Sequence, residues 1–338
     1  MQDNLLLKLI TRTAAWKAFL AAFFLSVTCQ AAGESQFSLI DSRNQVSSAV
    51  RKAYSAFRQP FEMSMVKVSE NSVEPVRIAG CGDHWVMEFL NGAERYIIVD
   101  KEGLSYSAGD KSEFFPKSMP AFIWFRLASS DPDVILRNFM PYAAGGIRSA
   151  GADAELIRLV PSDGQGYGLM MAVDSGTGLM LDAAAVDRGG SVIEQYTVTG
   201  FSSDPSVRKG KLCTMRHQSR EAGPEYISSG ENGGSSLLGY LPVGYRVIAY
   251  EKKRYIDGLG QAGYFLVSNG IFDFSVYLTK HSRNFHIGGM KMGENIVYHR
   301  ENKNGYDVAV VGMLPMETAE LVAASIDQKA FDNILSGR

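Results

Sequence analysis

The sequence lacks the features by which most enzymes and nucleic-acid-binding proteins are recognised. It contains no GxSxG elbow, HExxH helix, P-loop or CxxC pair, so acyl transfer, zinc-dependent hydrolysis, nucleotide hydrolysis and thiol redox chemistry have no signature here. Its 34 basic and 36 acidic residues nearly cancel, to a formal net charge of −2. A duplex-binding protein needs a basic surface that neutralises phosphates. We therefore expect no nucleic-acid partner, no cofactor and no catalytic residue.

A metal-binding pattern is missing as well. Of the five histidines, His281 and His286 are five residues apart, which places them on opposite faces of a strand and off the i, i+4 spacing of helical ligands. We predict no metal site. Carboxylates are scattered along the chain, and folding could still bring two of them together. An unrecognised enzyme therefore stays among the alternatives.

Apolar runs are short. The run at residues 18–27, AFLAAFFLSV, falls well below the ~20 residues that a membrane-spanning helix needs. Lys8, Arg12 and Lys17 precede it and small residues follow it, which is the order of a secretory signal peptide. We predict that residues 1–32 are a signal peptide removed on export. A single-pass anchor is the alternative.

Cysteine is rare, with three in the chain. Loss of the signal peptide would remove Cys29 and leave Cys81 and Cys213 in a compartment where disulfides persist. The two are a candidate bridge, which requires Cα atoms within about 7 Å of each other. Two unpaired, buried cysteines are the other interpretation.

Turn signals, in contrast, are plentiful. Residues 85–106 hold three apolar runs separated by Asn91-Gly92 and by a second turn at Gly103, which predicts three consecutive antiparallel strands. Four further strand-like runs between residues 155 and 201 are also separated by glycine-rich turns. Before them, apolar spacing predicts a helix within residues 36–58, and Asp131-Pro132 predicts a second helix start.

The composition changes after residue 202. Residues 203–235 are rich in Pro, Gly, Ser and mixed charge, which is typical of a linker. Strand-like runs then resume, and a short helix is expected at residues 317–326. We predict an N-terminal domain at residues 33–202, a linker at 203–235 and a C-terminal domain at 236–338.

An aromatic-rich segment of the first domain is FFPKSMPAFIWF at residues 114–125. Its two prolines exclude a long helix, and its aromatics are too apolar for an exposed loop. A core plug is the interpretation that the residues alone favour. The lip or lining of an apolar cavity is the functional alternative.

Several segments together resemble the RseB/MucB family of periplasmic regulators. They are EFLNGAERYIIVDKEGLSYSAGDKSEFF at 88–115, SGTGLMLDAAAVDRGGSVIEQYTVTGF at 175–201, LPVGY at 241–245, FLVSNGIFDFSVYL at 265–278 and YDVAVVGMLPMETAELVAASI at 306–326. No single segment is diagnostic, and the resemblance rests on their order and spacing over residues 36–326.

The resemblance implies an α+β fold. Its first domain would be an antiparallel half-barrel like those of the lipoprotein carriers LolA and LolB, wrapped on helices. Its second would be a smaller α/β domain with an antiparallel sheet. It also implies a function: the chain would bind the periplasmic segment of a membrane-bound anti-sigma factor of the RseA or MucA type. It would shield that segment from proteolysis until lipid or lipopolysaccharide acyl chains release it.

A curved sheet with an apolar concave face favours the cavity interpretation of residues 114–125. We predict that its wall combines one strand face with this segment: Trp85, Met87, Phe89, Phe122, Trp124 and Phe125. A lipid or lipoprotein carrier would share this cavity. The extra C-terminal domain favours the regulator over the carrier, because a carrier needs only the cavity.

Overall fold

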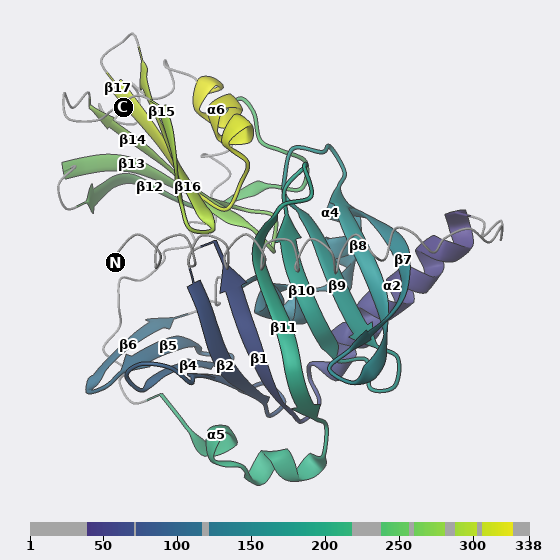
Figure 1. Cartoon of the computed structure of the whole chain (residues 1–338). Helices are drawn as coiled ribbons and strands as arrows, with labels where there is room; N and C mark the ends of the chain where they lie inside the picture. Colours follow the sequence, from purple (N-terminus) through teal and green to yellow (C-terminus); the bar gives the residue numbers. More distant parts are fainter. Residues whose placement is uncertain are drawn as a thin grey trace, which may run out of the picture. The chain divides into compact units, whose positions relative to one another are not determined.

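The computed structural model describes residues 39–70, 72–116, 122–217, 238–256, 260–280, 288–302 and 306–326. The predicted signal peptide lies outside these ranges. The described strands form two antiparallel sheets, one of 11 strands and one of 6 (Figure 1). An α+β fold with two antiparallel sheets is thereby confirmed.

The strands of the first sheet are β1 (Phe61–Ser69), β2 (Ser72–Gly80), β3 (Trp85–Phe89), β4 (Arg95–Val99), β5 (Gly103–Ala108), β6 (Lys111–Pro116), β7 (Phe139–Ser149), β8 (Ala152–Pro161), β9 (Gly168–Asp174), β10 (Met180–Val186) and β11 (Val192–Ser202). Those of the second are β12 (Arg246–Ile256), β13 (Gly260–Ser268), β14 (Asp273–Lys280), β15 (Gly288–Met292), β16 (Asn295–Asn302) and β17 (Tyr306–Gly312). The described helices are α2 (Leu39–Ala56), α3 (Ile123–Ser129), α4 (Pro132–Asn138), α5 (Lys211–Thr214), α6 (Met316–Ala324) and the 3₁₀ helix η2 (Pro205–Lys209).

The first sheet is built from neighbours in sequence. Its order is β6-β5-β4-β3-β2-β1-β11-β10-β9-β8-β7, so two meanders are joined where β1 pairs with β11. The predicted run of three strands is confirmed as β3, β4 and β5. Both of its turns use glycine in the left-handed region, at Gly92 (φ +74°) and Gly103 (φ +153°). β6 and β7 do not pair with each other, so the sheet stays open.

One face of this sheet carries the main core. Burial alternates along β1, and its buried face presents Phe61, Met63 and Met65. The predicted N-terminal helix is confirmed as α2, whose Val50 packs into the same cluster together with Phe57, the residue that follows the helix. The inward-facing side chains of β1, which occupy every second position, thus pack in one core with the apolar face of α2.

Helix α3 covers this face too. The expectation that residues 114–125 form no long helix holds: the segment begins within β6, and α3 has seven residues. Helix α4 begins as predicted at Asp131-Pro132, where the Asp131 side chain accepts a hydrogen bond from Asp133 N at 2.8 Å. These two short helices place the aromatic end of the segment against the sheet.

The other face of β2 to β4 is covered by the chain that follows β11. Val86 and Ile98 pack there with Leu212 and Cys213 of α5. The structure joins Cys213 to Cys81 in a disulfide, with Cα atoms 5.8 Å apart. The start of the predicted linker therefore contains η2 and α5, while residues 218–235 lie outside the described part.

The second sheet packs α6 on one face. Phe265, Val276 and Val310 from its central strands meet Val322 of the helix in a separate core cluster. The predicted C-terminal helix is confirmed. The turn between β13 and β14 adds Ile271 and Phe272 to the core of the first sheet.

Candidate aromatic and charged site

The six residues predicted to line a cavity do come together. Trp85, Met87 and Phe89 lie on one face of β3, in the same core cluster as Phe122, Trp124 and Phe125. The ring of Phe57, the residue after α2, stacks on Trp85 with ring centroids 5.2 Å apart and meets Phe125 edge-on at 5.3 Å. We call these seven residues, Phe57 included, the aromatic cluster.

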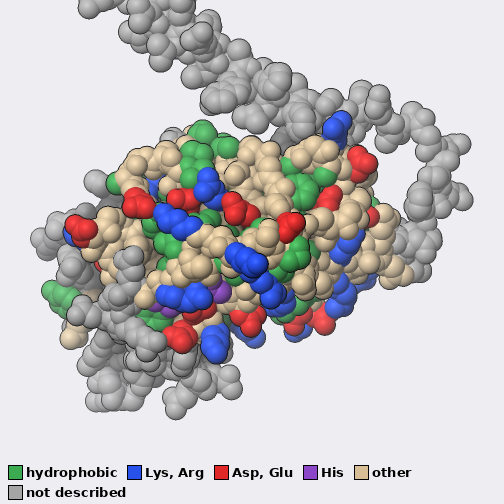
Figure 2. Space-filling model, turned by 90° about the horizontal axis from the view of Figure 1, so that it is seen from below, with side chains coloured by type: hydrophobic (Ala, Val, Ile, Leu, Met, Phe, Trp, Pro, Cys, Tyr) green, Lys and Arg blue, Asp and Glu red, His purple; other side chains and the backbone are tan. Residues whose placement is uncertain are grey.

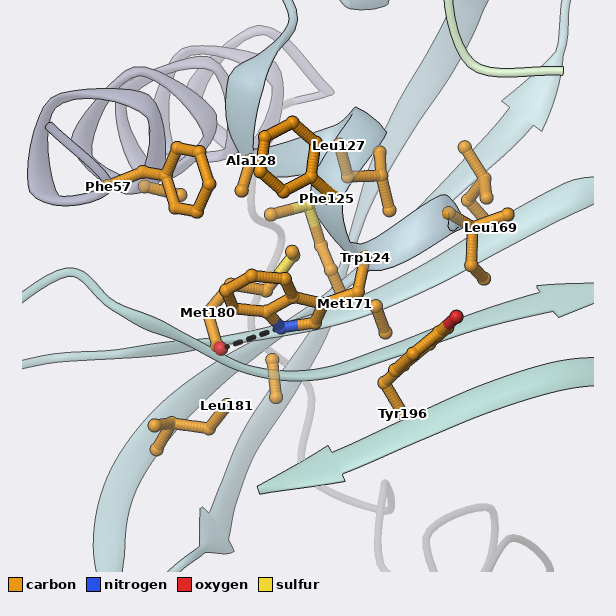
Figure 3. Packing of buried hydrophobic residues seen from close by; sticks show 14 of the residues in the cluster. Phe57, Trp124, Phe125, Leu127, Ala128, Leu169, Met171, Met180, Leu181 and Tyr196 are labelled. Atoms are coloured by element: carbon orange, nitrogen blue, oxygen red, sulfur yellow. Dashed lines mark hydrogen bonds between the residues drawn. The ribbon is translucent and has the colours of Figure 1, made fainter. Parts of the chain in front are cut away.

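The deep end of the aromatic cluster is tightly packed. Trp124 and Phe125 are both 1% exposed, and the Trp124 indole donates a hydrogen bond to the Met180 carbonyl at 3.2 Å (Figure 3). Figure 3 shows Trp124 among Phe57, Met171, Met180 and Tyr196. In this structure the deep end is therefore protein core, and entry of an acyl chain stays a prediction that requires it to open.

The end of the aromatic cluster at Phe122, which we call the shallow end, is different, because the Phe122 side chain is only partly buried. The Phe122 ring lies 6.5 Å from Phe89 and 6.3 Å from Tyr196. Phe122 immediately precedes α3, and its side chain is less deeply buried than that of Trp124. A ligand would enter most easily here.

A buried ion pair borders this shallow end. Lys67 continues the buried face of β1 after Met65 and is 7% exposed, and its Nζ atom lies 5.1 Å from the centre of the Phe122 ring. Glu194 Oε1 lies 3.2 Å from Nζ, and Glu294 Oε1 lies 3.4 Å from it. The sequence analysis missed this cluster, although a lysine at the next inward position of an apolar strand was its visible signal.

The two carboxylates determine the charge state of Lys67. Burial lowers the pKa of Lys67, but Glu194 and Glu294 outweigh it and raise that pKa above its usual value. Burial raises the pKa of Glu194, and Lys67 only partly opposes that shift. Tyr196 donates a hydrogen bond to Glu194 Oε1 at 2.9 Å. Lys67 is therefore a buried cation at neutral pH.

A Ser-His-Asp arrangement lies on the opposite face of the sheet. His217 Nδ1 is 2.7 Å from Ser105 Oγ, and its Nε2 is 3.0 Å from Asp100 Oδ2. Burial alone would raise the pKa of Asp100, but the His217 contact and the backbone N–H groups of Glu102 and Gly103 outweigh it and lower that pKa. Ser105 is fully buried, so no substrate reaches its Oγ atom while His217 covers it. The arrangement fastens residue 217 to the sheet.

A separate pocket beside α2 is mainly polar. It is lined by Gln45, Ser48, Ala49, Lys52, Glu155, Val173, Asp174 and Ser175. None of the predicted cavity residues lines it, and its polarity does not suit an acyl chain. On the face shown in Figure 2, basic and acidic side chains are interspersed.

No helix among the described residues is long and apolar enough to cross a membrane, and those residues hold no group of three metal-ligating side chains.

Two family models match the chain. The MucB/RseB N-terminal domain matches residues 48–216, and the MucB/RseB C-terminal domain matches residues 236–327.

Similar proteins include the sigma-E factor regulatory protein RseB of Haemophilus influenzae, 26% identical over 70% of this chain and 75% of the relative. The sigma factor AlgU regulatory protein MucB of Pseudomonas aeruginosa is 24% identical, over 71% of this chain and 76% of its own length. The solved MucA/MucB complex of P. aeruginosa contains a chain with the same fold. That chain aligns with a TM-score of 0.62 at 19% identity, over 84% of this chain and 98% of its own. With both domains matched in order, this chain belongs to the MucB/RseB family.

Proposed function

We propose that this chain is a periplasmic regulator that binds the periplasmic segment of a membrane-bound anti-sigma factor of the MucA or RseA type. The observation that carries the proposal is the match of both family domains in order. Relatives are named as sigma factor regulatory proteins, and structures similar to this chain include MucB in complex with MucA(peri). The regulator shields the bound segment from proteolysis.

Export to the periplasm is part of the proposal. Residues 1–32 have the order of a secretory signal peptide, in which basic residues precede an apolar run and small residues follow it. The disulfide between Cys81 and Cys213 suits an oxidising compartment.

Contacts between the two sheets support a regulator over a simple carrier. Arg126 of α3 pairs with Asp273 at the start of β14, with Nη2 2.5 Å from Oδ2. Asn138 donates to the Asn269 carbonyl at 2.8 Å, and Tyr167 donates to the Leu314 carbonyl at 2.9 Å. Changes beside α3 therefore reach the second sheet through direct contacts.

Lipid is the releasing signal in this proposal. An acyl chain entering at Phe122 would gain ~0.8 kcal/mol for each buried CH₂ group, so a chain of ordinary length could offset the opening of the aromatic cluster. If lipid weakens binding of the anti-sigma segment, that segment must weaken lipid binding by the same factor. A lipid carrier is the second candidate, favoured by the aromatic cluster alone.

Capture of partners from the source envelope tests the proposal. The tagged mature chain is retained on a column, and bound proteins are identified by mass spectrometry, with and without an acyl-chain lipid in the wash. We expect a single-pass anti-sigma factor that lipid elutes. Capture of lipoproteins without an anti-sigma factor would instead support the carrier.

A further inference from the structure

Lys67 has two carboxylate partners that are held very differently. Glu194 is 1% exposed and is fixed by the Tyr196 hydroxyl. Glu294 follows β15 at the tip of the hairpin formed with β16, and its side chain is 28% exposed. Glu294 is therefore the partner that can leave without unpacking the core of the first sheet.

The cluster holds one negative charge too many. Lys67 supplies one positive charge against two carboxylates, and the nearby Glu74 is already paired with Arg95 at 3.4 Å. Glu194 Oε2 is buried and accepts no hydrogen bond from the described residues. A third anion added here would be repelled, whereas an anion that replaces Glu294 would keep the buried ammonium paired.

The position of Lys67 defines the kind of anion. Its Nζ atom lies above the Phe122 ring, at the shallow end of the aromatic cluster, on the strand face that also presents Met63 and Met65. An apolar tail packed beside Phe122 would bring a charged head within reach of Nζ. The arrangement thus fits an amphiphile, with tail and head contacts side by side.

We propose that Lys67 binds the anionic phosphate or carboxylate group of an amphiphile whose tail lies against Phe122, and that this group replaces Glu294 and frees the tip of the β15–β16 hairpin from β1. The inference rests on the lipid binding proposed above and adds the head-group contact and the route to the second sheet.

The hairpin tip has a second link to β1 that is weaker. Lys291 pairs with Glu70 at 2.9 Å, but both side chains are more than 40% exposed. Exposed ion pairs contribute little to stability. Of these two ion pairs, the one made by Glu294 is therefore the stronger link between the tip and β1, and Lys291 provides a matched control.

Titrations with matched probes test the exchange. The folded wild type, Glu294→Gln, Lys67→Met and Lys291→Gln are titrated with dodecyl phosphate, dodecanol and inorganic phosphate, with tryptophan fluorescence as the readout. Hydrogen exchange at residues 290–296 reports the hairpin tip. We expect the wild type to bind dodecyl phosphate about tenfold more tightly than dodecanol, because only the phosphate forms a charged hydrogen bond with Lys67.

The variants should distinguish the role of the Lys67 ammonium group from that of the Glu294 carboxylate. Glu294→Gln should tighten dodecyl phosphate binding, leave dodecanol binding unchanged and show fast exchange at 290–296 before any ligand is added. Lys67→Met should lose the preference, and Lys291→Gln should keep it. Lys67→Met leaves Glu194 unpaired and could unfold. In that case the result for Glu294→Gln alone decides whether the proposal holds.

Three results would overturn the inference. If the wild type binds both amphiphiles but Glu294→Gln changes neither affinity nor exchange, the exchange is wrong while lipid binding stands. If inorganic phosphate binds as tightly as dodecyl phosphate, the ligand is not an amphiphile. If the wild type binds neither amphiphile, the proposed lipid binding itself fails.

Discussion

Trp124 fills the deepest part of the aromatic cluster and also fixes the backbone of β10 through Met180. Truncating a fully buried tryptophan costs about 3–5 kcal/mol. We predict that Trp124→Ala lowers the free energy of unfolding by this amount and that Trp124→Phe costs clearly less, as measured by urea denaturation. A loss below about 1 kcal/mol in Trp124→Ala would show that the cluster is loosely packed.

Phe122 is the residue at which lipid binding is best tested. A charged substitution at Trp124 would unfold the core, and Phe89 is only 8% exposed, whereas Phe122 is partly exposed. We predict that Phe122→Ala weakens binding of a fluorescent acyl probe about tenfold while the protein stays folded. Tyr142→Ala, on exposed β7, is the control. Unchanged affinity in folded Phe122→Ala would mean that these aromatics are ordinary core residues.

Tyr167 provides a prediction for alkaline pH. Burial raises the pKa of its hydroxyl to about 12, above the usual value of ~10 in an unfolded chain. The unfolded chain therefore loses this proton first, and the stability that Tyr167 contributes falls as pH rises from 10 to 12.

The comparison variant is Tyr167→Phe, which loses the hydrogen bond to Leu314. It should be about 1 kcal/mol less stable than the wild type at pH 8, and this gap should close and then change sign before pH reaches 12. Urea denaturation at several pH values measures it, with exposed Tyr255→Phe as the control. A gap that stays constant over this range would contradict the burial argument.

At the scale of elements, the disulfide holds α5 against β2. It closes a loop with a sequence separation of 132 residues, and such a bridge typically stabilises by about 2–4 kcal/mol. We predict that Cys81→Ser with Cys213→Ser, or a reductant on the wild type, lowers the urea midpoint to the same value. The double variant should not respond to reductant. A wild type that is equally stable with and without reductant would show that the bridge does not form.

Local signals in the sequence were enough for elements defined by neighbours in the chain. Glycine turns at Gly92 and Gly103 predicted β3 to β5, and the Asp131 cap predicted α4, because both depend on adjacent residues. The same logic could not find η2 and α5. Their contacts with β2 and β3 depend on Cys213 and Leu212 reaching strands more than a hundred residues away.

The candidate site was predictable only in part, for the same reason. Because side chains alternate between the two faces of a strand, the sequence of β3 placed Trp85, Met87 and Phe89 on one face. The many aromatic residues in 114–125 indicated burial. The packing of Phe57 among them, and the meeting of Lys67 with Glu194 and Glu294, arise from strand pairing and from contacts between the two sheets. No local pattern encodes such contacts.

At the scale of the whole molecule, regulation requires that two binding events communicate. The aromatic cluster packs on the first sheet and Lys67 lies in its strand β1, whereas Asp273 begins β14 of the second sheet, Glu294 lies in the turn between β15 and β16, and Leu314 follows β17. Ligand entry at Phe122 and partner binding on this chain would be linked through these contacts. The linkage must then be reciprocal and of equal size in both directions.

The most direct test of the regulator proposal is calorimetric titration of the mature chain with the purified periplasmic segment of the anti-sigma factor from the source bacterium, with and without a saturating acyl-chain lipid. We predict saturable one-to-one binding with a Kd of about 1 μM or tighter, weakened at least about tenfold by lipid. Absence of measurable binding by a folded, disulfide-bonded chain would contradict the account.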